Sequence, residues 1–177
     1  MHSVAMARVM FGEFEKPKIL YPQIARTYRF AFDEENYFCN DKAFFIPTDN
    51  LYLLAILQSR VAEFYLRILT ATEFGGFMNL HKQFIEKVPI PDVPISEQQI
   101  IKKLVQELLE LKGEGAGAKD LEQELNERVY WLFNLTRDEI NLIEERIGSA
   151  QNVSGGLRSG VWPSPSRPSA RSVGGVC

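Results

Sequence analysis

The stretch AFFIPTDNLYLLAILQSRVAEFYLRIL, residues 43–69, contains the change of pattern that decides the fold class. Its first four residues form an apolar run closed by Pro47, which is typical of a buried strand that ends at the proline. From residue 51 onward the apolar residues recur at helical spacing, and Asp49 or Asn50 is the expected N-cap. A strand followed directly by a packed helix, within the pattern described below, predicts an α+β domain.

The residues before this stretch predict further short strands. Apolar residues alternate loosely over residues 18–24 and more clearly over residues 28–32. A polar cluster at residues 33–36 predicts a turn, so residues 28–39 are expected to form a hairpin. We interpret the acids of this cluster as solvated turn residues: Asp33, Glu34 and Glu35. The expected core is a small mixed or antiparallel sheet with packed helices.

The second half of the chain predicts helices joined by short links. Residues 96–112 and residues 119–133 have apolar residues at helical spacing, and a third, shorter helix is expected after Thr136. Two pairs have the spacing of capping boxes: Ser96 with Gln99, and Thr136 with Glu139. These helices are expected to form a helical hairpin or a small bundle.

Three units follow from these patterns. They are an α+β domain at residues 16–94, a helical spacer or docking region at residues 95–147, and a disordered tail at residues 148–177. Sixteen of the thirty tail residues are Gly, Ser or Pro, and such a segment cannot bury enough apolar surface to offset the entropy of ordering.

The composition favours a cytoplasmic protein without a membrane span. No uncharged apolar run reaches the length of a spanning helix, and the first ten residues lack the layout of a signal peptide. The net charge is −3, but residues 16–91 hold nine Lys and Arg against eight Asp and Glu, whereas residues 92–147 hold seven against thirteen. A basic face for nucleic acid would therefore be a local feature of the first half.

Motifs that would indicate catalysis are missing from the sequence. It contains no phosphate-binding loop of the G-x-x-x-x-G-K-[ST] or G-x-G-x-x-G type, no G-x-S-x-G turn and no Asn-Pro-Pro-Tyr-type loop. Two cysteines and two histidines do not have the spacing of a zinc site. We therefore expect this chain to be no enzyme by itself, with neither a metal nor a cofactor of its own.

Three stretches, taken in order, resemble the TaqI-like C-terminal specificity domain. They are Lys16–Arg26 with Arg29–Asp33, Ala43–Pro47 with Leu53–Ser59, and Phe74–Phe77 with Lys82–Pro91. The family follows the methyltransferase domain in type IIG and related restriction-modification proteins. The third stretch, with the helix start at Glu97–Ile101, is also similar to the end of a recognition domain in type I specificity subunits. The resemblance spans about residues 16–147.

This resemblance implies sequence-specific recognition of double-stranded DNA. The chain would be a fragment that lacks the catalytic domain of an adenine-specific methyltransferase or endonuclease. The methyltransferase domain, in the same chain or in a partner subunit, would bind S-adenosylmethionine and flip the target base. The alternative is a helical protein-interaction or oligomerisation module without direct DNA contact, since the helix at residues 96–112 suits docking as well as simple packing.

Candidate DNA contacts lie in the strand region and in the loop from Thr70 to Lys82. Arginine can contact guanine or phosphate through two hydrogen bonds, and glycine allows close approach to a backbone. The strand-region candidates are Arg26, Tyr28, Arg29, Asn40 and Lys42. The loop candidates are Gly75, Gly76, Asn79, His81 and Lys82. The alternatives are surface ion pairs for the cations, core packing for Tyr28 and a plain turn for the glycines; Arg60 and Arg67 are expected to face solvent or pair with Glu63.

Overall fold

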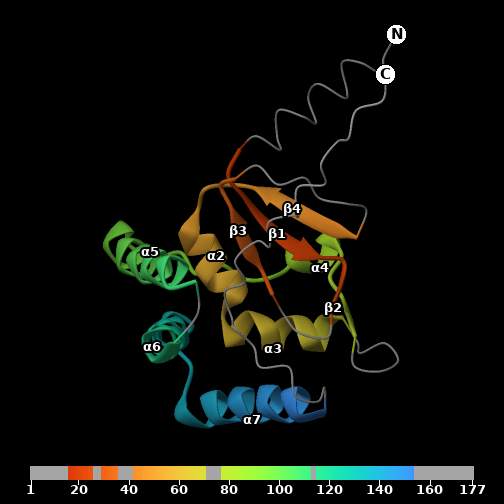
Figure 1. Cartoon of the computed structure of the whole chain (residues 1–177). Coiled ribbons are helices and arrows are strands. Elements are labelled where there is room, and N and C mark those ends of the chain that lie inside the picture. Colours follow the sequence, from red (N-terminus) through yellow and green to blue (C-terminus); the bar gives the residue numbers. More distant parts are fainter. Residues whose placement is uncertain (1–15, 26–28, 36–41, 71–76, 113–114, 154–177) are drawn as a thin grey trace, which may run out of the picture.

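The structure is a computed structural model of the whole chain (Figure 1). It describes residues 16–25, 29–35, 42–70, 77–112 and 115–153, with side chains as far as residue 149. Residues 148–153 of the predicted disordered tail belong to the last helix of the described chain, so the prediction that the tail starts at residue 148 is wrong. Residues 154–177 lie outside these ranges.

Two small antiparallel sheets form the β part of the fold. The larger has β1 (Lys18–Pro22) at its centre, between β3 (Ala31–Asp33) and β4 (Ala43–Pro47). The smaller pairs β2 (Ile24–Ala25) with β5 (Met78–Asn79). Helices pack against this β part, so the predicted α+β class is confirmed (Figure 1).

The segment predicted as a hairpin contributes a strand to the larger sheet. β3 pairs with β1, from Lys18 opposite Asp33 to Leu20 opposite Ala31. The expected return arm, at residues 37–39, lies outside the described residues. Glu34 and Glu35 are exposed, as predicted. The interpretation of Asp33 as a solvated turn residue is wrong, because it ends β3 facing Lys18 and is buried.

The predicted helix over residues 51–69 is two helices. α2 (Leu51–Gln58) begins at the predicted cap Asn50, whose side chain accepts hydrogen bonds from two first-turn amides. Ser59 has extended backbone angles and ends α2. Its Oγ donates to the Ile56 carbonyl and accepts from the first turn of α3 (Arg60–Leu69). One serine therefore caps both helices, a break that apolar spacing does not reveal.

The three helices predicted in the second half of the chain are present, with shifted ends. They are α5 (Ile95–Glu110), α6 (Gly115–Leu132) and α7 (Arg137–Val153), and the short α4 (Lys82–Ile85) precedes them. The capping box of Thr136 and Glu139 is confirmed by hydrogen bonds in both directions.

The capping box predicted at Ser96 and Gln99 is wrong. α5 already begins at Ile95, after Pro94, so Ser96 lies inside the first turn. The polar contact at this end comes from Gln98, whose Nε2 donates to the Val93 carbonyl. Proline fits a helix start because it has no amide hydrogen to satisfy.

One core cluster joins the β structure to helices α2 to α6. Figure 1 shows α2 and α3 beneath the larger sheet, α5 and α6 beside them, and α7 below α3. The cluster takes fully buried side chains from β1, α2, α3, α5 and α6, among them Ile19, Leu54, Leu66, Leu108 and Val129. A second cluster, of Tyr130, Ile143 and Ile147, packs against α3. The division at residue 94 stays a prediction, and residues on both sides of it share the core.

Candidate nucleic-acid interface

Gln23, in the connection between β1 and β2, organises one end of the β structure. Its amide donates to the Lys42 carbonyl at 2.9 Å, and its carbonyl accepts from the Leu80 amide at 2.8 Å. These two hydrogen bonds join the start of β4 to the residue that follows β5. Four predicted site residues lie around this junction, and we call them the sheet-end surface: Lys42, Asn79, His81 and Lys82.

The His81 ring is held by aromatic packing. Its centroid lies 6.1 Å from that of Phe44 on β4, and Phe44 lies 5.7 Å from Tyr21 on β1. His81 is half-buried and directly precedes α4. Because two strands support this row of rings, His81 has a defined direction without being fully covered.

The two lysines of the surface are exposed. Lys42 precedes β4, and Lys82 opens α4. The Lys82 Nζ lies 3.3 Å from a carboxylate oxygen of Glu86, and both side chains are largely in solvent. Exposed pairs of this kind contribute little energy, so the ammonium can exchange its partner for a phosphate at small cost.

Asn79 presents an unusual buried atom. Asn79 pairs with Ile24 across the smaller sheet, and the Asn79 Oδ1 is buried without a hydrogen-bond partner. Buried polar side-chain atoms nearly always have a partner, so this oxygen is an acceptor that the described part of the chain leaves unused.

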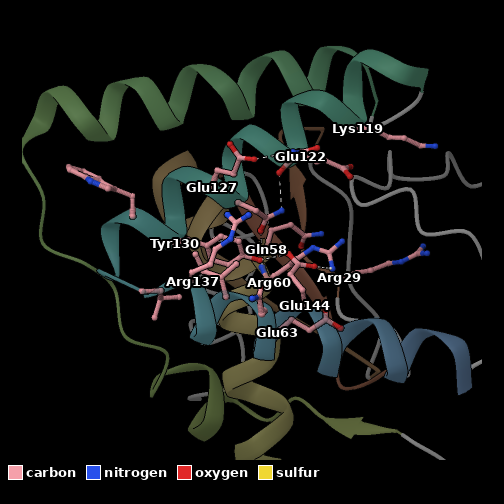
Figure 2. A pocket seen from close by; sticks show the side chains of 16 residues that line it. Arg29, Gln58, Arg60, Glu63, Lys119, Glu122, Glu127, Tyr130, Arg137 and Glu144 are labelled. Carbon is pink, nitrogen blue, oxygen red and sulfur yellow. Dashed lines mark hydrogen bonds and ion pairs between the residues drawn. The ribbon is translucent and has the colours of Figure 1, made fainter.

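Arg29 lies apart from the sheet-end surface. It precedes β3 at one edge of the larger sheet, whereas Lys42 precedes β4 at the other. Arg29 lines a pocket of about 900 Å³ at the junction of α2 and α3 with α6 and α7 (Figure 2). The next residue is tied to the same place, since the Phe30 amide donates to Gln58 Oε1 at 2.7 Å. Arg29 therefore lines this pocket, and none of the four residues of the sheet-end surface does.

The other five predicted contacts lie outside the described residues: Arg26, Tyr28, Asn40, Gly75 and Gly76. They remain predictions. In the chain, Arg26 directly follows β2 and Gly76 comes two residues before β5.

Sequence reasoning missed a polar link between α3 and α7. Arg67 pairs with Glu63 at 2.6 Å, which is one of the two outcomes expected for it. Arg60 instead pairs with Glu144 at 2.9 Å, and Glu144 accepts a hydrogen bond of 2.5 Å from the Tyr130 hydroxyl. Burial and the neighbouring carboxylate raise the pKa of Tyr130. No local pattern points to a pair separated so far along the chain.

The described part of the chain contains no group of three or more His, Cys, Asp or Glu side chains placed to hold a metal ion. Within the same residues, no helix combines the length and apolar character needed to cross a membrane.

Residues 5–90 match the model of the TaqI-like C-terminal specificity domain. This part of the chain is a TaqI-like specificity domain. The match confirms the family resemblance and ends at Ile90, so α5, α6 and α7 lie beyond it. No curated protein matches the chain. The chain therefore carries a specificity domain of the restriction-modification type, and the sheet-end surface lies within it.

Proposed function

We propose that this domain recognises a target sequence in double-stranded DNA on behalf of an adenine-specific methyltransferase or endonuclease. The observation that carries the proposal is the family match over residues 5–90. The grouping of Lys42, His81 and Lys82 at one end of the β structure supports it, because cations and hydrogen-bonding side chains gather there in a chain of negative net charge.

The proposed roles follow from side-chain chemistry. Lys42 and Lys82 contact phosphates and set the position of the duplex, since an ammonium is a point charge without base preference. His81 contacts base edges, for which a defined orientation matters more than charge. The ring contact with Phe44 restricts His81 before binding and so lowers the entropy lost in the complex.

In this proposal the chain itself catalyses nothing. A methyltransferase domain, in the same chain or in a partner subunit, binds S-adenosylmethionine and takes the target base out of the stack. Type IIG organisation and an attached endonuclease belong to the same proposal.

Duplex binding by the full chain tests the proposal. We would measure fluorescence anisotropy with a pool of duplexes of random sequence, at several salt concentrations, for the wild type and for Lys42→Gln/Lys82→Gln. We expect weaker binding in the double variant. The slope of the logarithm of its binding constant against the logarithm of the salt concentration should be shallower by about 0.9 for each phosphate that the missing ammonium groups no longer neutralise.

The chain offers a matched control in Lys103→Gln. The Lys103 side chain on α5 is 77% exposed and pairs with Glu107 four residues on, whereas that of Lys82 is 79% exposed and pairs with Glu86 in the same way. We expect no change in this control. Absence of duplex binding at low salt, or an equally large decrease in Lys103→Gln, would contradict the proposed surface.

A further inference from the structure

The pocket beside Arg29 is built largely by elements outside the family match. Its floor is the junction of α2 and α3, and its walls include α6 and α7 (Figure 2). The volume of about 900 Å³ lies in the range of pockets that hold small molecules. The lining is strongly charged, with Arg29, Arg60, Glu63 and Glu144 near its centre.

The two carboxylates near the centre are already engaged. Glu144 accepts from Arg60 at 2.9 Å and from the Tyr130 hydroxyl at 2.5 Å. Glu63 pairs with Arg67, which does not line the pocket, at 2.6 Å. The negative charge of these two carboxylates is therefore compensated within the protein. The lining also contains two further acids, Glu122 and Glu127, and two further cations, Lys119 and Arg137.

Among the cations that line the pocket, Arg29 has a buried donor without an acceptor. Its Nε is buried and has no hydrogen-bond partner, and no ion pair joins its guanidinium to an acid of the described chain. A buried guanidinium nitrogen without an acceptor is costly, so an acceptor supplied by a ligand would be bound favourably. Arg60 lies beside it and uses only one terminal nitrogen for Glu144.

We propose that this pocket binds a small molecule through an oxyanion, a phosphate or a carboxylate, with Arg29 as the anchoring residue. The guanidinium group presents two parallel N–H donors to such an anion, which an ammonium cannot do. Arg60 contributes a second, weaker contact from the floor of the pocket. The site is separate from the sheet-end surface, and the proposal does not depend on DNA recognition.

Titration of the isotope-labelled full chain tests the site. The probes are AMP, inorganic phosphate and glutamate, each followed by NMR chemical shifts of residues around the pocket. We expect a saturable shift with at least one probe, and the probe that binds decides between phosphate and carboxylate. Arg29→Gln should weaken that binding at least tenfold. Arg29→Lys, which keeps the charge but loses the planar donors, should weaken it less and serves if the first variant does not fold.

The control is Arg128→Gln on α6, because Arg128 pairs with Glu124 and does not line the pocket. It should bind the probe like the wild type. Probe titration of Lys42→Gln/Lys82→Gln separates this site from the DNA surface, since neither lysine lines the pocket and probe binding should be unchanged. The proposal is overturned if no probe gives a saturable shift, if Arg29→Gln binds like the wild type, or if duplex competes directly with the bound probe.

Discussion

Lys18 and Asp33 face each other across β1 and β3, and their side chains form an ion pair of 2.6 Å with both at 0% exposure. Removing two charges from water is expensive, and a close partner offsets that cost only while both remain. Asp33 also accepts a hydrogen bond from the Glu35 amide through its other oxygen. The pair thus fixes the register of β1 and β3, although nothing in the local sequence separates Asp33 from the exposed acids beside it.

Asp33→Ala should destabilise the protein by roughly 3–5 kcal/mol, because it removes the buried carboxylate that forms an ion pair with the Lys18 ammonium. Urea unfolding followed by circular dichroism measures this. Glu34→Ala, at the neighbouring exposed acid, should change stability by less than about 0.5 kcal/mol. The double variant Lys18→Met/Asp33→Leu should recover most of the lost stability. If Asp33→Ala and Glu34→Ala change the stability equally, the buried pair is not what holds the register.

At the scale of elements, caps decide where the helices begin and end. Asn50 starts α2, Ser59 separates α2 from α3, and Thr136 starts α7 through Glu139. In the last case the Thr136 amide and hydroxyl both donate to one Glu139 oxygen at 2.8 Å. These hydrogen bonds stabilise the carboxylate form and lower the pKa of Glu139.

The α7 cap should therefore depend on pH. A lowered folded-state pKa means that the stabilisation is present above the unfolded value of 4.5 and is lost as the pH falls through the lower folded value. NMR titration of the Glu139 carboxyl should show the lowered pKa, and Thr136→Ala should return it toward 4.5. Glu139→Gln keeps a capping side chain and should remove this pH dependence of helix α7. If the Glu139 pKa is unchanged in Thr136→Ala, the hydrogen bonds of the cap are not what lowers it.

At the scale of the molecule, the family-matched segment and the helices beyond it share one core. α2 packs on α5, and four side chains of α5 are buried: Ile101, Leu104, Val105 and Leu108. Full burial of each such side chain stabilises a fold by about 1.5–3 kcal/mol, which together is comparable with the net stability of a whole domain. The polar link of Arg60 to Glu144 adds a fixed geometry between α3 and α7.

Leu108→Ala should cost about 2–5 kcal/mol and lower the urea midpoint of the whole protein in one transition, including the signal from the β structure. Ile100→Ala on the same helix is the matched control. Ile100 is 39% exposed, so this variant should cost much less stability. If the two variants behave alike, or if the sheet unfolds separately from α5, the shared core does not couple the two regions.

The sequence by itself determined what depends on neighbours along the chain. The α+β class, the helical segments, the caps at Asn50 and Thr136, and the pair of Arg67 with Glu63 are readable because they follow from spacings of three or four residues. It also determined the family through the order of three short stretches.

Only the tertiary structure decided which distant residues meet. It buried Asp33 against Lys18, joined Lys42 to the end of β5 through Gln23, and placed Arg29 in a pocket formed by α6 and α7. The break at Ser59 also depends on the tertiary structure. The Asn126 side chain of α6 accepts a hydrogen bond of 3.0 Å from the amide of Arg60, the residue that follows Ser59. The physical reason is that strand register and helix packing are set by the burial of whole faces, and that balance has no signature in any short window of sequence.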